Sequence, residues 1–382
     1  MAELRVILTV NYSPWAPYAG GGQRSTHQLG CALSELGHHV TVVYTRAPLD
    51  TWRAPEGLPY RVVYAPFVAL VSRGRSPLRP LNALTVRRAV LEVARRGSVV
   101  HCQGEEGALL PEPARHHGFA LLATPRYPAY PAPLFGESRL RRRLVPPKFW
   151  ALEALLLGAD RVVPTSKATA IEVQRAFAVR AERLAVVPNG IAEEFQRTPR
   201  RSGASGPIAF FGRIEHSKGV DTLIEAYARL PAPKPRLVIA GRGTSEGAMR
   251  ELAARLRCEV EFVGWRDTAA LAALLSEARL AVLPSREESF GNAMAEAMAS
   301  GVPLISTRVG SIPEVTGDAA CLVESSNVEA LRAAMAHLLG SETESDRLGA
   351  LGRTRMLESY SWASTAKRFE ALYRDVLAER AL

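Results

Sequence analysis

The stretch that decides the fold runs from residue 280 to residue 301 and reads LAVLPSREESFGNAMAEAMASG. Its apolar start, Leu280 to Leu283, predicts a buried strand, and the alanine- and methionine-rich segment from Asn292 to Ser300 predicts a helix that Gly301 terminates. In an open α/β sheet, the loop between the carboxyl end of a strand and the next helix lies over the ligand crevice. We therefore expect the loop between these two elements to border a ligand site.

Two glutamates in this stretch are candidates for ligand contact. Glu288 lies in the loop and Glu296 lies one turn into the helix, whose start is marked by the amides of Phe290, Gly291 and Asn292. A carboxylate accepts hydrogen bonds but does not donate them, whereas helix-start amides favour anions. Together these groups suit a ligand that carries both hydroxyls and phosphate, such as a nucleotide sugar. Taken singly, each glutamate is better explained as a solvated surface charge.

The surrounding pattern resembles one enzyme family. The E-x7-E spacing of Glu288 and Glu296 is followed by AMASGVPLIS at 297–306 and GSIPEV at 310–315. This arrangement resembles the retaining nucleotide-sugar glycosyltransferases of family 4, which have the GT-B fold. The resemblance implies an α/β chain with two Rossmann-like domains whose parallel sheets face a central crevice. It also implies that Glu288 contacts the transferred sugar and Glu296 the ribose hydroxyls.

A second motif, GRIEHSKGVDTLIEAY at 212–227, is similar to the family pattern G-R-x-x-x-x-K-G-x-D-x-L-I-E-A. The match implies that Arg213 and Lys218 hold the donor diphosphate. One fork-shaped and one point-like cation suit this task, because together they neutralise the charge that develops on a leaving diphosphate.

Two further segments extend the resemblance. EFVGWRD, which contains Trp265 and Arg266, resembles the family loop whose backbone meets the nucleobase, and GGGQRSTHQLGCALSELGHHVTVV at 20–43 resembles the family's first loop and helix. In that first loop a Gly-Gly pair faces the donor phosphates and the acceptor. The donor-binding residues implied by the resemblance are Gly20, Gly21, Trp265, Arg266, Ser289, Phe290, Gly291, Asn292 and Glu296, and the catalytic residues are Arg213, Lys218 and Glu288.

The first half departs from the family pattern. Gln23 stands where many relatives have Glu, Arg126 stands where relatives carry the His of a V-x-T-x-H segment, and the nearby H-x-H pattern survives only as His101-Cys102-Gln103. Two accounts of Arg126 stay open. It is a permanent cation facing the donor phosphates or an anionic acceptor, or it is a surface-loop residue and His101 is the better candidate for the acceptor or sugar side. A strand-end histidine is itself explained either as a core residue or as a site residue.

The charge of the chain favours anionic partners without choosing among them. Forty-eight Lys and Arg against 38 Asp and Glu give a net charge of +10, which attracts nucleic acid, anionic lipid and nucleoside diphosphates alike. The arginines are spread widely and neither an aromatic-rich RNA-binding signature nor a zinc finger occurs, so we expect no nucleic-acid partner. The basic, aromatic segment 139–157 suits either contact with an anionic membrane surface or a helix docked on its own domain.

Length and composition predict two domains. A chain of 382 residues can bury two cores of ordinary size, and segments 158–177 and 276–296 share an outline of apolar strand, Pro, Ser and helix. The expected parts are an acceptor-side domain of residues 1–195 plus 363–382, a linker at 196–205 and a nucleotide-sugar-binding domain at 206–362. No apolar run approaches the roughly 20 residues of a membrane-spanning helix. We therefore expect a cytoplasmic protein, whose membrane contact, if any, is peripheral and on the inner face.

The expected activity is transfer of a sugar from a nucleoside diphosphate donor to an acceptor hydroxyl, with retention of configuration. The resemblance implies that neither a metal nor a cofactor is needed, the nucleotide sugar being a co-substrate, and that the departing phosphate takes the proton of the acceptor. The acceptor is left open among glycan, lipid-linked and small-molecule hydroxyls. The alternatives are a GT-B epimerase or phosphorylase, a basic nucleic-acid-binding protein, and a dehydrogenase, although GGGQRST lacks the G-x-G-x-x-G spacing of the last.

Overall fold

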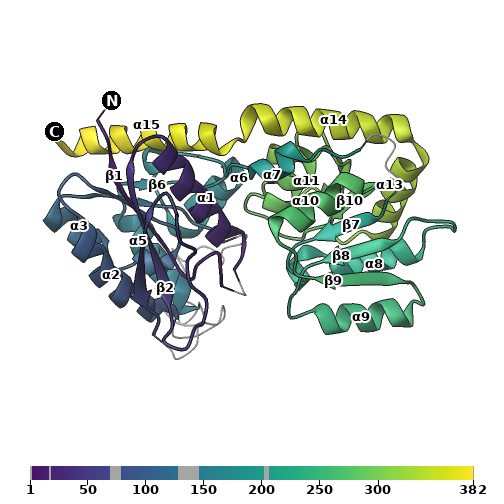
Figure 1. The fold of residues 1–382 in the computed structure, drawn as a ribbon, viewed down its shortest axis with the longest axis horizontal. Coiled ribbons are helices and arrows are strands. Elements are labelled where there is room, and N and C mark those ends of the chain that lie inside the picture. Colours follow the sequence, from purple (N-terminus) through teal and green to yellow (C-terminus); the bar gives the residue numbers. More distant parts are fainter. Residues whose placement is uncertain (1, 17–18, 69–78, 128–145, 202–205, 382) are drawn as a thin grey trace. The chain divides into compact units, whose positions relative to one another are not determined.

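The computed structural model of the chain describes residues 2–16, 19–68, 79–127, 146–201 and 206–381. It divides into two compact units (Figure 1): the first comprises Met1–Gly190 and Trp362–Leu382, and the second comprises Ile191–Ser361. Residues 202–205 of the expected linker and residues 139–145 of the basic segment lie outside the described residues.

The first unit is built on a six-stranded parallel sheet with the order β3-β2-β1-β4-β5-β6. Its strands are β1 (Arg5–Val10), β2 (His39–Arg46), β3 (Arg61–Pro66), β4 (Val99–Cys102), β5 (Ala120–Ala123) and β6 (Arg161–Val162). Buried strands rich in Val, such as RVILTV and HVTVVYTR, form such a sheet because both of its faces are covered. The strand order reverses between β1 and β4, which is where open α/β sheets bind ligands at the carboxyl ends of their strands.

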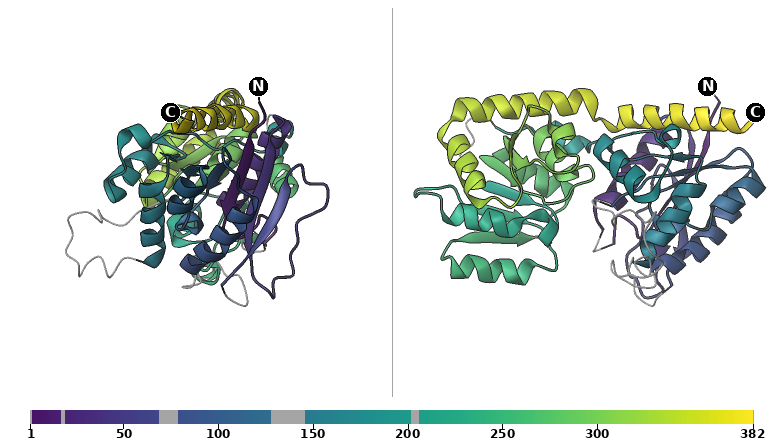
Figure 2. Two further views of the ribbon diagram at one scale, coloured as in Figure 1. Left: turned by 90° about the vertical axis from the view of Figure 1, so that its left-hand side faces the viewer. Right: turned by 180° about the vertical axis from the view of Figure 1, so that it is seen from behind.

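Helices cover both faces of this sheet. They are α1 (Gly21–Glu35), α2 (Asn82–Val93), α3 (Pro111–His117), α5 (Pro147–Gly158), α6 (Lys167–Phe177) and α15 (Trp362–Ala381). Leu8 packs in one core with Leu29 of α1 and Tyr373 of α15, whereas its neighbour Ile7 packs in another core with Leu152 of α5. Figures 1 and 2 show α1 and α15 on one face of the sheet and α2, α3 and α5 on the other.

Helix α15 follows the second unit in the sequence but packs in a core of the first. Its residues Phe369, Tyr373 and Val376 are buried there. Close to the point where the chain returns, a Cβ on Gly190 would lie 2.5 Å from a ring carbon of Trp362. Only a glycine permits this contact. Because α15 packs in the first unit, that unit is discontinuous in sequence.

The second unit has a parallel sheet with the order β12-β11-β10-β7-β8-β9. Its strands are β7 (Ile208–Phe211), β8 (Leu237–Ala240), β9 (Val260–Gly264), β10 (Leu280–Leu283), β11 (Leu304–Thr307) and β12 (Cys321–Val323). Its helices are α7 (Glu193–Arg197), α8 (Val220–Ala228), α9 (Glu246–Arg255), α10 (Thr268–Glu277), α11 (Asn292–Ala299), α12 (Ile312–Thr316), α13 (Val328–Gly340) and α14 (Glu342–Ser359). Side chains cap three of these described helices: Asp267 accepts from the Ala270 amide at the start of α10, Asn327 from the Ala330 amide at the start of α13, and Ser341 from the Glu344 amide at the start of α14.

These two parallel, helix-covered sheets confirm the expected fold class of two Rossmann-like domains. None of the described helices combines the length and the apolar character needed to cross a membrane. Helix α5, the described part of the basic segment, buries Phe149, Leu152 and Leu155 in its own unit and exposes 39% of Trp150.

Candidate functional site

The loop between β10 and α11 follows the order expected from the sequence. Strand β10 ends at Leu283 and α11 begins at Asn292. Gly291 precedes the helix with φ +90°, and a Cβ there would lie 2.3 Å from the terminal methyl of Met294. This left-handed backbone conformation favours glycine. The first amides of α11 have no acceptor within the helix, so this end of α11 can bind an anion.

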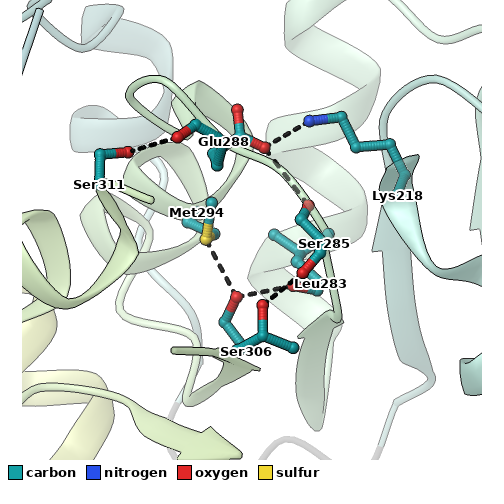
Figure 3. A network of polar contacts seen from close by, with 8 residues as sticks. Lys218, Leu283, Ser285, Glu288, Met294, Ser306 and Ser311 are labelled. Atoms are coloured by element: carbon teal, nitrogen blue, oxygen red, sulfur yellow. Dashed lines mark hydrogen bonds and ion pairs between the residues drawn. The ribbon is translucent and has the colours of Figure 1, made fainter. Parts of the chain in front are cut away.

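Glu288 and Lys218 meet at this loop (Figure 3). The Lys218 ammonium forms an ion pair with Oε2 of Glu288, and the Ser285 hydroxyl donates to the same oxygen at 3.3 Å. The side chains of Lys218 and Glu288 are only 17% and 13% exposed. Ser311 fixes the backbone, because its amide donates to the Glu288 carbonyl oxygen at 3.3 Å. The structure thus brings together two residues that the sequence assigned to diphosphate and sugar respectively.

Two glycines let the neighbouring loops approach backbone to backbone. A Cβ on Gly310, which has φ +52°, would lie 2.2 Å from the carbonyl oxygen of Glu288. A Cβ on Gly219, which has φ +65°, would lie 2.1 Å from the carbonyl oxygen of Pro284. Any side chain at either position would push apart the loops that follow β7, β10 and β11. The glycines of the K-G and G-S-I-P-E-V motifs therefore set the position of Glu288.

Arg286, which the sequence did not single out, clamps the same loop. Its guanidinium donates to both carboxylate oxygens of Asp221, at 2.8 and 2.9 Å, and to the carbonyl oxygen of His216 at 2.6 Å. Its own amide donates to the Ser217 carbonyl at 2.7 Å. Burial alone would raise the pKa of Asp221, but the hydrogen bonds from Arg286 and from the Thr222 amide outweigh it, so that this pKa is lowered. The clamp holds Lys218 close to Glu288.

The other expected residues of the second unit differ in exposure. Arg213 is exposed, and its guanidinium forms no hydrogen bond or ion pair with any described residue. Trp265 is 52% exposed and Arg266 is exposed, at the carboxyl end of the edge strand β9. Ser289, Asn292 and Glu296 are half-buried. Phe290 instead packs in the core against Tyr360, with ring centroids 5.8 Å apart, so that only its backbone can face a ligand.

His101 of the first unit is a core residue. Its side chain is fully buried, Nδ1 shares a hydrogen bond of 2.8 Å with the Tyr373 hydroxyl, and Nε2 shares one of 2.8 Å with the Thr124 hydroxyl. Burial, and secondarily the charge of Arg126, lower its pKa to about 3. The imidazole is therefore neutral at physiological pH, and both its nitrogens are occupied by protein groups.

Arg126 lies at the carboxyl end of β5 and is anchored on both sides. Its Nε donates to Oε1 of Gln103 at 2.8 Å, Nη2 donates to the same oxygen, and Nη1 donates to Oδ1 of Asn189 at 3.3 Å. A Cβ on Gly22 would lie 3.1 Å from Cδ of Arg126. Burial lowers the pKa of Arg126 to about 10 and Glu106 opposes this effect, so the group stays charged at neutral pH. These contacts contradict the surface-loop account of Arg126.

The glycine loop before α1 is held by Gln23. The side chain of Gln23 accepts from the Gly20 amide at 3.0 Å and donates to the carbonyl oxygen of Asn11 at 2.8 Å. Gly21 is the first residue of α1. Gly20 and Gly21 thus lie at the amino-terminal end of a helix, as the resemblance implies.

Beneath this loop lies a buried acidic pair that the sequence did not reveal. Glu105 and Glu106 are 0% and 1% exposed. Thr9 donates to Oε1 of Glu106 at 3.0 Å, Asn11 donates to Glu105 at 3.2 Å, and the Tyr127 hydroxyl donates to Glu105 at 2.6 Å. The pair thus joins the ends of β1, β4 and β5. The sequence signal was the G-E-E-G run after an apolar strand.

Comparison with known proteins assigns the family. Residues 19–195 match the family described as Glycosyltransferase Family 4, and residues 206–341 match Glycosyl transferases group 1. The chain is 30% identical over 397 residues to an MMP α-(1→4)-mannosyltransferase of Mycolicibacterium hassiacum, covering 94% of this chain and 96% of the relative. The chain belongs to glycosyltransferase family 4. A D-inositol 3-phosphate glycosyltransferase of Segniliparus rotundus shares 29% identity over 98% of this glycosyltransferase and 90% of the relative.

Solved structures show the same fold. Sucrose-phosphate synthase of Thermosynechococcus elongatus superposes on the glycosyltransferase with a TM-score of 0.82 at 23% identity, covering 98% of this chain and 100% of that one. WaaG, a glycosyltransferase of lipopolysaccharide biosynthesis, superposes with a TM-score of 0.74 at 18% identity, covering 96% and 99%. These similarities confirm the GT-B fold. Within the described residues of the glycosyltransferase, no group of three or more His, Cys, Asp and Glu side chains is arranged to hold a metal ion.

Proposed function

We propose that this glycosyltransferase moves a sugar from a nucleoside diphosphate donor to an acceptor hydroxyl, with retention and without a metal. The observation that carries the proposal is the Lys218–Glu288 ion pair, which places a cation and a carboxylate side by side at the carboxyl ends of β7 and β10. Among the structural neighbours, Anabaena HepE was solved with UDP-glucose and Arabidopsis starch synthase IV with ADP and acarbose. Proteins of this fold therefore bind nucleotides and a nucleotide sugar, which supports the proposed donor class.

Lys218 and Glu288 each have a role in the transfer reaction. When the bond between the anomeric carbon and the phosphate oxygen breaks, negative charge develops on the diphosphate. Lys218 and Arg213, both in the segment between β7 and α8, are the cations that we expect to oppose it. A bound diphosphate competes with Glu288 for the Lys218 ammonium. Glu288, once released, accepts hydrogen bonds from the hydroxyls of the sugar and orients it.

The transfer step balances without a protein nucleophile. The acceptor oxygen forms a bond to the anomeric carbon on the face that the diphosphate leaves, and the acceptor proton passes to the leaving phosphate oxygen. The helix-start amides of α11 contribute further stabilisation of the diphosphate. Glu296 accepts from the ribose hydroxyls, and the segment of Trp265 and Arg266 contacts the base.

A nucleotide screen tests the donor class. UDP, GDP, ADP and their hexose derivatives are added to the full chain, and thermal unfolding is measured. A ligand at a hundred times its Kd stabilises by about 2.7 kcal/mol, so one nucleotide should raise Tm clearly above the other two. If none of them stabilised the chain, the donor assignment would fail.

Product analysis tests the reaction. With the stabilising donor, proton NMR should show that the new glycosidic bond has the anomeric configuration of the donor, and turnover should persist in excess EDTA. An inverted product would contradict retention, and loss of turnover in EDTA would contradict metal independence. Formation of an acceptor-dependent product separates transfer from epimerisation of the donor.

A further inference from the structure

We propose that the first unit holds an anionic group of the acceptor, a phosphate or a carboxylate, between Arg126, Gln103 and the first turn of α1. This inference rests on the proposed function, because it assigns the anion to the acceptor and leaves the diphosphate of the donor to the second unit. All three elements belong to the first unit.

Arg126 is a partly buried cation held by neutral groups. Its three hydrogen bonds run to the amide oxygens of Gln103 and Asn189, and it forms no ion pair with a carboxylate of any described residue. The side chain of Glu106 is engaged by Thr9 and by the Gln103 amide, each at 3.0 Å. A cation withdrawn from water without a paired anion is costly. A bound anion would supply the missing partner.

The first turn of α1 adds a second electropositive feature. Cδ of Arg126 lies 3.1 Å from the position of a Cβ on Gly22, so the side chain packs on the start of this 15-residue helix. A helix start carries partial positive charge, which normally favours acidic residues in the first turn. The first turn of α1 contains none, and Gln23 there is neutral. Two positive features thus adjoin here, and the carboxylate that acts on the Arg126 charge, Glu106, is already engaged by its own hydrogen-bond donors. This arrangement indicates a place for an anion.

Gln103 supplies the independent observation. It is 3% exposed, its side-chain oxygen accepts from Arg126, and its side-chain nitrogen Nε2 has no hydrogen-bond partner among the described residues. A buried donor left unpaired costs about 1–3 kcal/mol, so unpaired donors call for an explanation. Gln103 and the start of α1 thus both adjoin the Arg126 side chain. A group that only accepts hydrogen bonds, such as phosphate or carboxylate, satisfies their donors better than a hydroxyl does.

The experiment uses inorganic phosphate as the probe. Its Kd is measured by calorimetry on the full chain, alone and with a saturating amount of whichever nucleoside diphosphate stabilises it. Arg126→Gln should weaken phosphate binding by about tenfold to a hundredfold, the worth of hydrogen bonds to a charged group. The matched control is Arg175→Gln, an exposed arginine on α6 of the same unit, which should leave the Kd unchanged.

The measurements with and without nucleotide distinguish an acceptor anion from a donor phosphate. Phosphate binding that depends on Arg126 and persists beside saturating nucleotide supports an acceptor site. Competition between phosphate and nucleotide would assign the site to the donor and overturn the proposal, as would a parent-like Kd in Arg126→Gln or no phosphate binding by the parent. A thermal unfolding curve and a circular dichroism spectrum like those of the parent show that Arg126→Gln is folded, and unchanged nucleotide binding shows that the second unit is intact. Failure of the proposed function would appear separately, as absence of nucleotide binding in the parent.

A second readout uses acceptors. Glucose and glucose 6-phosphate form a pair that differs only in the anion, and kcat/KM is measured for each. The parent should prefer the phosphorylated acceptor, and Arg126→Gln should lose that preference while Arg175→Gln retains it. Equal use of the two sugars by the parent, or a preference that survives Arg126→Gln, would contradict an anionic acceptor site at Arg126.

Discussion

The two units place opposite kinds of polar chemistry at the carboxyl ends of the same kind of sheet. In the second unit two loop cations are paired with carboxylates, Lys218 with Glu288 and Arg286 with Asp221. In the first unit Arg126 is held by the neutral side chains of Gln103 and Asn189. A charged ligand of the second unit must displace one partner of an ion pair before it can bind the other. An anion that binds the first unit displaces no carboxylate from Arg126. The difference supports our proposal that the second unit binds the donor and that the first unit holds an anionic group of the acceptor.

The largest effect on activity is expected from substitution of the cations of the second unit. Lys218→Ala and Arg213→Ala should each lower turnover by roughly a hundredfold or more, because the charge that they oppose grows in the transition state. Initial rates of donor consumption measure the effect. Lys367→Ala and Arg255→Ala, exposed residues on α15 and α9, are the matched controls. Near-parental turnover in both site variants would remove the diphosphate assignment.

The Arg286 clamp is expected to have the next largest effect. Arg286→Leu removes the hydrogen bonds to Asp221 and His216 and should destabilise the second unit by about 1.5–3 kcal/mol. Amide exchange should accelerate in the loop between β10 and α11. Exchange and unfolding indistinguishable from the parent would show that the loop is held by other contacts.

The clamp also has a pH signature. Because the pKa of Asp221 is lowered in the folded chain, its contribution to stability is present above about pH 4 and is lost as the pH falls below that value. Asp221→Asn should therefore be less stable than the parent at neutral pH and approach it in acid. Unfolding midpoints between pH 3 and 7 measure the convergence, and a constant difference across that range would contradict the assignment.

Glu296→Gln sharpens the comparison within the donor site. An amide accepts more weakly than a carboxylate, so the affinity for the free nucleoside diphosphate should fall by about tenfold. Glu288→Gln should instead change KM for the sugar donor without weakening the affinity for the free diphosphate, because it removes the carboxylate that competes for Lys218. Calorimetry that found both variants equal to the parent would require the two glutamates to exchange or lose their roles.

The smallest effect concerns the first unit. Because the pKa of Arg126 is about 10, the acceptor kcat/KM of the parent should not change between pH 6 and 8 on account of this residue. In Arg126→His, the acceptor kcat/KM should fall as the pH rises past about 6.5, the usual pKa of histidine, because the side chain then loses its charge. A pH profile of the variant that matches the parent would place Arg126 outside the acceptor site.

The sequence predicted the parts of the site that depend on local pattern. The buried strand at 280–283, the helix start at 292 and the glycines of the loops follow from apolar runs and from backbone conformations that favour glycine. The resemblance also brought Lys218 and Glu288 into one site, although 70 positions separate them.

What the sequence could not supply are partners that meet only in the folded chain. His101 bonds to Tyr373, 272 positions away, and this contact makes it a core residue rather than an acceptor-side one. In the sequence, Arg286 does not differ from other loop arginines, because its partner Asp221 lies beside it only in the folded chain. The buried Glu105 and Glu106 gave no periodic signal, because their burial depends on Thr9, Asn11 and Tyr127, which lie in β1 and in the segments after β1 and β5.

The division between the units is tested most directly by titrating the stabilising nucleoside diphosphate into three proteins, the parent, Lys218→Ala and Arg126→Gln. Calorimetry on the full chain gives the Kd of each. The account predicts a Kd raised by about tenfold or more in Lys218→Ala, where a charged contact to the diphosphate is lost, and a parental Kd in Arg126→Gln. A Kd raised by Arg126→Gln and left unchanged by Lys218→Ala would contradict it.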